Sequence, residues 1–380
     1  MNIEPFRIAI PDADLADLQE RLRRTRRAPA IEDQGWSQGI APDFLDELLR
    51  YWQDGFDWRA QEARLNRLPQ YLAQIGEHTI HFVHQPGTGP APLPLVLTHG
   101  WPGSFIEFER ILPLLADPGA HGADPADSFH VVLPSLPGYG FSSPPRHKGV
   151  GTYTTAQLWA ELMTGLGYQR FGVQGGDLGA GVSAWLGQRF PERVIGMHLN
   201  FIPGSYQPPL GEGHPTLTPE EQDFKKRQGE WQQKEGAYAH MQGTKPYTAA
   251  TALNDAPAGL AAWIGEKFHA WSQDFDKSIP LDELLTDISL YWFTQSIGPS
   301  FQMYVEEQAK PFKVDEKLQP PLGVAVFPAE IVMPPRSWVE RGFDVRRWTP
   351  MPAGGHFAAF EEPELLAQEI RAFFSPLRQV

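Results

Sequence analysis

One short segment restricts the fold of this chain more than any other. The apolar run at 171–173 is typical of a buried strand, and residues 179–190 are typical of a helix. Between them lies a Gly-x-Asp-x-Gly turn formed by Gly175, Asp177 and Gly179. So tight a turn strains its central residue and requires small residues where strand and helix touch. The segment therefore predicts a strand–turn–helix elbow that presents Asp177 at the edge of a sheet.

Short apolar runs and helical stretches alternate on both sides of the elbow. Strand patterns occur at 80–82, 95–97, 131–133 and 194–197, with helical stretches such as 105–116 and 154–167 between them. Such alternation predicts a mostly parallel sheet with helices on both faces. An elbow on a sheet of this kind is typical of the α/β-hydrolase fold, which is the fold class we expect.

The alternation is interrupted once. It stops near residue 203, and strand patterns return at 324–327 and 345–348. We therefore expect an N-terminal wrapping extension at 1–76, a first part of the core at 77–203, a helical cap at 204–312 and a second part of the core at 313–380. Within the extension, alternation at 6–10 predicts a short strand, and apolar stripes at 43–75 predict two helices.

The composition excludes several classes of site and partner. The chain has no cysteine, which rules out disulfides, zinc–thiolate sites and a thiol nucleophile. Its formal net charge of −14 opposes a nucleic-acid partner or an anionic membrane. The sequence has no signal-peptide pattern, no apolar stretch of about 18 residues and no metal-ligand spacing of its histidines. We expect a cytoplasmic protein with no metal, no cofactor, no nucleic-acid partner and no membrane anchor.

The residue at the centre of the elbow indicates the reaction. A serine there would attack acyl carbon. A carboxylate such as Asp177 suits displacement at sp³ carbon, which gives an alkyl ester that water then cleaves. The alternative is that Asp177 only caps the helix that follows it.

A histidine and an acid complete the expected triad in the chain order nucleophile, acid, histidine. His356 stands in a Gly-rich loop between a strand and the last helix, where it can act as general base on the hydrolytic water. Glu330 follows the strand at 324–327 and would orient the imidazole. The alternatives for this acid are Asp315, Glu316 and Asp344.

Two backbone N–H groups are expected to form an oxyanion hole. Trp101 belongs to the turn His99-Gly100-Trp101-Pro102 that follows the strand at 95–97, and Leu178 comes directly after the nucleophile. For an alkyl ester, such a hole would polarise the Asp177 carbonyl during attack by hydroxide.

Taken together, the motifs resemble those of the microsomal-type epoxide hydrolases, which carry an N-terminal domain of their own. The resemblance covers nearly the whole chain and rests on Asp57-Trp58-Arg59, His99-Gly100-Trp101-Pro102, Gly138-Tyr139-Gly140-Phe141-Ser142, Gly175-Gly176-Asp177 and Gly354-Gly355-His356-Phe357. It implies hydrolysis of a small apolar or aromatic epoxide to a vicinal diol.

The resemblance also implies two tyrosines in the cap that hydrogen-bond the epoxide oxygen. Tyr238 and Tyr304 are the expected pair, with Tyr247 and Tyr291 as alternatives. One position departs from the family pattern, because Leu178 stands where relatives usually carry Trp. The missing N-terminal anchor indicates a soluble, bacterial-type member, and a homodimer is compatible with the sequence.

Three other functions compete with this interpretation. A haloalkane dehalogenase shares the chemistry of Asp, His and acid but uses an indole N–H directly after the nucleophile, which Leu178 cannot supply. A catalytically silent small-molecule binder of the same fold would be expected to lack part of the triad. An ester or lactone hydrolase is the third alternative.

Overall fold

The computed structural model describes residues 1–379, in which strands and helices alternate through the core. The strands are β1 (Asn2–Pro5), β2 (Gln70–Ile75), β3 (His78–Gln85), β4 (Leu93–Thr98), β5 (Phe129–Pro134), β6 (Phe171–Gly175), β7 (Val194–Leu199), β8 (Pro321–Val326) and β9 (Asp344–Pro350). The core helices are α4 (Ile111–Ala116), α5 (Thr152–Gly165), α6 (Asp177–Arg189), α14 (Arg336–Glu340), α15 (Ala358–Glu361) and α16 (Pro363–Phe374), with the short 3-10 helix η1 at Phe105–Phe108.

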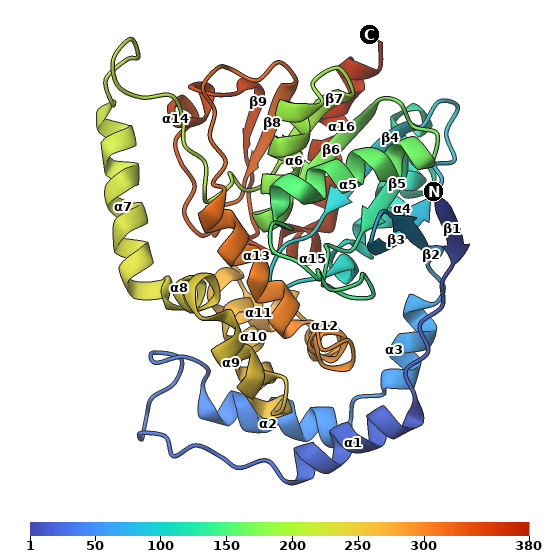
Figure 1. Ribbon diagram of the computed structural model, residues 1–380, viewed down its shortest axis with the longest axis vertical. Helices are drawn as coiled ribbons and strands as arrows, with labels where there is room; N and C mark the ends of the chain where they lie inside the picture. The colour runs from blue at the N-terminus through green and yellow to red at the C-terminus, as the bar shows by residue number, and fades with distance from the viewer. Residues whose placement is uncertain (380) are drawn as a thin grey trace.

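All nine strands form one sheet in the order β1-β2-β3-β5-β4-β6-β7-β8-β9. The strands from β5 to β9 run parallel, whereas β1, β2 and β3 pair antiparallel at one edge. Helices α5 and α6 pack together on one face, and α4 and α16 pack on the other (Figure 1). Because both faces are covered, the central strands are apolar along their length: Leu95, Val131 and Val173 are fully buried. The expected α/β-hydrolase architecture is confirmed.

The segment between β7 and β8 forms a helical cap. Its helices are α7 (Pro219–Glu235), α8 (Ala237–Thr244), α9 (Pro246–Leu253), α10 (Pro257–Trp271), α11 (Phe275–Ser278), α12 (Leu281–Phe293) and α13 (Ile297–Ala309). In Figure 1, α8 to α13 lie beyond one end of the sheet, and α7 extends away from them at the side. Among residues 1–379, no helix has both the length and the apolar character needed to cross a membrane.

The N-terminal segment starts at the sheet, crosses the cap and returns to the sheet. After β1, helices α1 (Asp12–Arg23) and α2 (Pro42–Asp54) contact α10 on the side of the cap that faces away from the sheet, and α3 (Trp58–Leu65) leads back to β2 (Figure 1). Trp52 in α2 donates to Ser289 in α12 at 3.1 Å, within the apolar contact. The segment thereby connects the cap to the core.

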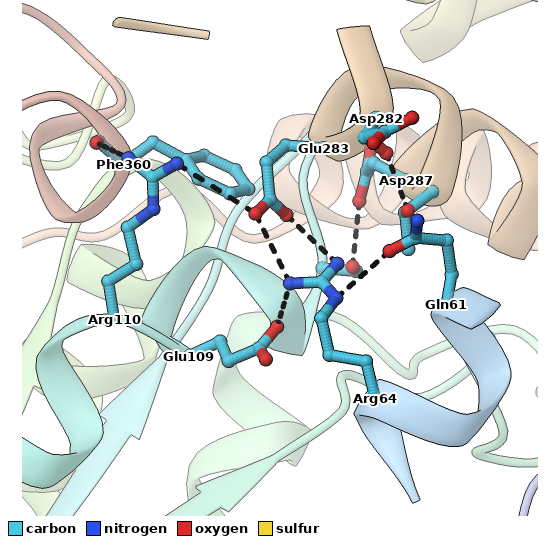
Figure 2. A network of polar contacts seen from close by, with 10 residues as sticks. Gln61, Arg64, Glu109, Arg110, Asp282, Glu283, Asp287 and Phe360 are labelled. Atoms are coloured by element: carbon cyan, nitrogen blue, oxygen red, sulfur yellow. Dashed lines mark hydrogen bonds and ion pairs between the residues drawn. The ribbon is translucent and has the colours of Figure 1, made fainter. Parts of the chain in front are cut away.

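Arg64 in α3 contacts both the core and the cap (Figure 2). Its guanidinium lies 2.6 Å from the Glu109 carboxylate of the core and 3.1 Å from the Glu283 carboxylate of α12. The Arg64 Nε–H also donates to Gln61 at 2.9 Å. All three charged side chains are largely buried, so water screens these ion pairs less than it would at the surface.

Two local predictions in the N-terminal segment are wrong. Residues 6–10 form an extended segment outside the sheet, because side chains of α3 and of the residue after it bind the backbone of this segment. Asn66 pairs with both Ile8 N and Ile8 O, and Glu62 accepts from Ile10 N. Residues 70–75, expected within a helix, form β2 between β1 and β3.

Candidate active site

The elbow between β6 and α6 holds Asp177 in a left-handed backbone conformation with φ of 47°. Such a conformation strains any residue except glycine, and it turns the side chain out above the sheet edge. Gly179 makes the turn possible, since a Cβ there would lie 1.9 Å from Thr98 O. Gly100 likewise makes room for the carboxylate, because a Cβ at that position would lie 2.3 Å from Asp177 Cβ.

His356 lies between the carboxylates of Asp177 and Glu330. Its Nε2 is 3.6 Å from Asp177 Oδ2, and its Nδ1 is 2.6 Å from Glu330 Oε1. The loop that carries it is anchored to the cap by a hydrogen bond from His356 N to Trp271 O at 2.9 Å. Glu330 is itself positioned by a bond from Ile331 N to its Oε1 at 2.7 Å.

The two carboxylates determine the charge of the imidazole. Burial lowers the pKa of His356, but the adjacent Glu330 and Asp177 raise that pKa more, so that it lies well above its usual value. The resting site therefore favours an imidazolium between two carboxylates.

The two backbone N–H groups expected to form the oxyanion hole lie beside the same carboxylate. Trp101 N donates to Asp177 Oδ1 at 2.9 Å. The N–H of Leu178 has no hydrogen-bond partner among residues 1–379, which leaves it available to a developing oxyanion.

Two cap tyrosines face the nucleophile over Trp101. The Tyr238 ring stacks on the Trp101 ring at a centroid distance of 5.3 Å, and the Tyr304 ring meets Trp101 edge-on at 5.9 Å. Burial raises the pKa of both phenols, and the nearby Asp177 carboxylate raises it further. Both side chains are therefore protonated donors.

Two cavities meet at the nucleophile, and Asp177 is the one residue that lines both. The larger, of 550 Å³, lies between core and cap and is lined by Leu178, Tyr238 and Tyr304. Its volume suits a small organic molecule.

The smaller cavity, of 20 Å³, lies on the His356 side and is lined by Glu107 as well. It is large enough for about one water molecule.

Two protein-family models match this chain, and both agree with the geometry of the site. The model described as "Epoxide hydrolase N terminus" matches residues 3–108, and the model described as "alpha/beta hydrolase fold" matches residues 94–234. The rabbit (Oryctolagus cuniculus) protein named Epoxide hydrolase 1 is 39% identical over 98% of this chain and 88% of its own length. This chain belongs to the epoxide hydrolase family.

Solved epoxide hydrolase structures share the whole architecture. The Aspergillus niger epoxide hydrolase is 33% identical, covers 99% of this chain and 97% of its own, and superimposes with a TM-score of 0.86. The juvenile hormone epoxide hydrolase of Bombyx mori is 29% identical, covers 100% of this chain and 95% of its own, and has a TM-score of 0.87. The resemblance drawn from the sequence motifs is thereby confirmed.

The alternative acids of the sequence analysis lie away from this epoxide hydrolase site. Asp315 is an exposed partner of Lys313, Asp344 pairs with Arg346, and Glu316 is exposed. The structure brings Glu330 to His356 instead.

The alternative tyrosines also lie elsewhere. Tyr247 is 83% exposed on the surface. Tyr291 is buried, but its hydroxyl donates to Gly103 O at 2.9 Å and so is already occupied. Tyr238 and Tyr304 both line the large cavity.

Sequence reasoning missed Glu107. This residue lies in η1, and its carboxylate occupies the space that a side chain at Gly103 would need. Burial raises its pKa well above the usual value, with Asp287 and Asp177 raising it further and His356 lowering it. The only sign of Glu107 in the sequence was its spacing from Gly103 in the turn after Pro102. That spacing could be interpreted only after the cavity was known.

Proposed function

We propose that this protein hydrolyses epoxides through a covalent ester on Asp177. The observation that carries the proposal is the position of Asp177 between two cavities, one lined by the cap tyrosines and the other by His356. This arrangement supports a two-step reaction in which substrate and water approach the same carboxylate from different sides.

In the first step, a carboxylate oxygen of Asp177 attacks an epoxide carbon. The C–O bond of the ring breaks, and its electron pair remains on the epoxide oxygen. Tyr238 and Tyr304 donate hydrogen bonds to that oxygen, and one of them transfers its proton to it. An alkoxide is a poor leaving group in the absence of such a donor, so the tyrosines supply the acid part of the reaction.

In the second step, water cleaves the ester. Esterification removes the negative charge of Asp177, so His356 loses one of the two carboxylates that raise its pKa. The imidazolium can then release its proton to the tyrosine phenolate left by the first step. The neutral imidazole accepts a proton from water while Glu330 holds its Nδ1–H. Hydroxide attacks the Asp177 carbonyl, the oxyanion forms near the N–H groups of Trp101 and Leu178, and the diol leaves.

The small cavity is the best candidate for the position of the hydrolytic water. It joins His356 to Asp177, and Glu107 is its one further carboxylic acid. Within residues 1–379, burial and the charges of Asp287, His356 and Asp177 act on the Glu107 carboxyl but no hydrogen bond does, which leaves it free to hold a water molecule. Glu107 would then orient the water toward the ester.

Aromatic and aliphatic side chains dominate the large cavity near the nucleophile. Leu178, Phe201, Trp231 and Val332 line it, while glutamines such as Gln232 lie along it as well. This lining supports a small apolar or aromatic epoxide as substrate. The cytoplasmic location, the bacterial type and the homodimer expected from the sequence stay predictions.

The test is the conversion of styrene oxide to its diol by purified protein. Asp177→Asn should abolish turnover, because an amide is a far weaker nucleophile. His356→Gln should slow ester hydrolysis much more than ester formation, so that an enzyme–substrate adduct accumulates and is detected by intact mass.

A rate like that of the wild type in Asp177→Ala would exclude the covalent mechanism. Faster turnover of haloalkanes than of epoxides in a matched panel would favour the dehalogenase alternative.

A further inference from the structure

A buried lysine lies behind one of the two cap tyrosines. Lys267 in α10 is 7% exposed, and its ammonium is 4.8 Å from the ring centroid of Tyr238 and 5.7 Å from that of Trp271. It lines neither active-site cavity, so substrate in the large cavity does not touch it. Its ion pair is with the neighbouring Glu266, at 2.5 Å.

The ion pair with Glu266 offsets part of the cost of burying the Lys267 charge. Lysine is almost never fully buried without compensation, and an apolar side chain such as Met would fill the same space at lower desolvation cost. The face of an aromatic ring attracts a cation, and the attraction strengthens when the ring becomes electron-rich.

Tyr238 becomes electron-rich in the proposed reaction. When its O–H proton moves to the epoxide oxygen, the phenolate charge spreads into the ring that faces Lys267. Burial and the carboxylates of Asp177, Glu266 and Glu330 oppose that change by raising the pKa of Tyr238, and only the hydrogen bond with Tyr304 lowers that pKa. The His356 imidazolium shares its charge with Asp177 and Glu330.

We propose that Lys267 is a positioning residue for the first step, which acts through Tyr238 by stabilising the negative charge that the ring gains when its hydroxyl protonates the opening epoxide. This inference rests on the proposed function. It assigns the two tyrosines unequal roles, with Tyr238 as the principal proton donor and Tyr304 as the second hydrogen-bond donor. The proton that the His356 imidazolium releases once Asp177 is an ester restores the phenol, and the proton that His356 then takes from water regenerates the imidazolium.

The experiment measures the two steps separately by stopped-flow tryptophan fluorescence with styrene oxide. Lys267→Met should lower the rate of ester formation about 5- to 30-fold and leave ester hydrolysis nearly unchanged. Lys267→Arg should restore most of the rate, because the guanidinium also binds the face of a ring. Lys310→Met is the matched control: Lys310 lies over the Tyr153 ring outside the site and should have no effect on either step.

A double-mutant cycle separates this role from a structural one. In a Tyr238→Phe background, Lys267→Met should have almost no further effect on ester formation, since the ring no longer gains charge. An equal loss in both backgrounds, an equal loss in both steps, or no loss at all would overturn the proposal. If Lys267→Met fails to fold, Lys267→Gln takes its place in the same cycle. Absence of any ester in the wild type would instead refute the proposed function, so the two failures are distinguishable.

Discussion

At the scale of single residues, the site depends on a change in charge at Asp177. As a carboxylate, Asp177 favours a protonated His356 at 3.6 Å. As an ester, it no longer does so, and the same imidazole becomes a base. One residue can therefore serve as nucleophile in the first step and control the base in the second.

Glu107 provides a test at this scale. Glu107→Gln keeps the size of the side chain but changes how it holds the water in the small cavity. We expect ester hydrolysis to slow about 10- to 100-fold, with ester formation little changed, because misplacement of a reacting group has costs of this size. Single-turnover kinetics measures both rates.

Glu109→Gln is the control for Glu107→Gln. Glu109 lies two residues further on and contacts Arg64 rather than the cavity, so its substitution should leave both rates close to those of the wild type. Hydrolysis at the wild-type rate in Glu107→Gln would remove this residue from the mechanism.

The predictability of the site also differs from residue to residue. Asp177, His356 and Glu330 could be assigned because each stands in a local motif with a fixed order along the chain. Glu107 and Lys267 could not, since their importance depends on what lies across the fold. A glutamate in a turn or a lysine on a helix is usually a solvated side chain, and only burial against Asp177 or Tyr238 makes it unusual.

At the scale of elements, the cap is joined to the core through a few polar contacts. Arg64→Met should lower the free energy of unfolding by about 1–3 kcal/mol, because it leaves the partly buried Glu109 carboxylate without its ion-pair partner and leaves Glu283 with Arg110 at 3.8 Å. Urea denaturation measures the change.

Arg59→Met in the same helix should change little, because the Arg59 guanidinium is exposed to water, and its partner Glu62 still accepts hydrogen bonds from Ile10 N and Trp58 Nε1. Equal destabilisation by both variants would contradict the role given to Arg64.

A second element-scale contact predicts a dependence of stability on pH. Asp287 in α12 is fully buried and accepts a hydrogen bond from Ser104 at 2.7 Å. Burial raises its pKa to about 8. The folded state therefore binds this proton more tightly than the unfolded state, and its stability should fall as the pH rises from about 4 to about 8.

Asp287→Asn should remove this pH-dependent loss, so that the variant gains on the wild type as the pH rises through that range. Melting temperatures across the range test this. Asp282→Asn on the same helix is the control, because it weakens the hydrogen bond that Tyr51 donates without removing a fully buried acid. Parallel curves for the wild type and Asp287→Asn would contradict the assignment.

The errors in element prediction have a physical cause. Leu65, Leu68, Tyr71 and Leu72 fit a helical stripe, but pairing of residues 70–75 with β1 and β3 outweighs that local preference. The alternation at Ile8 and Ile10 correctly indicated an extended segment with one buried side. It could not show that side chains of α3 would take the place of a neighbouring strand. In both segments, contacts with residues that are distant in the sequence determine the backbone structure.

At the scale of the whole molecule, the order of segments along the chain produces the site. The core carries the proposed nucleophile and base, and the cap carries the proposed proton donors. The N-terminal segment crosses the cap before it enters the sheet (Figure 1). Asp177 lies where these parts meet, with one cavity toward the cap and one toward the His356 loop. The central claim is that water attacks the enzyme ester and not the epoxide itself.

A single turnover in heavy-oxygen water tests this claim most directly. With enzyme in excess over styrene oxide, the attacking oxygen comes from water and should remain in the Asp177 carboxylate, while the diol carries an oxygen from the enzyme. After tryptic digestion, the peptide at 171–189 should therefore contain the heavy isotope, and the same peptide from Asp177→Asn should not. A heavy isotope found in the diol and absent from that peptide would contradict the account.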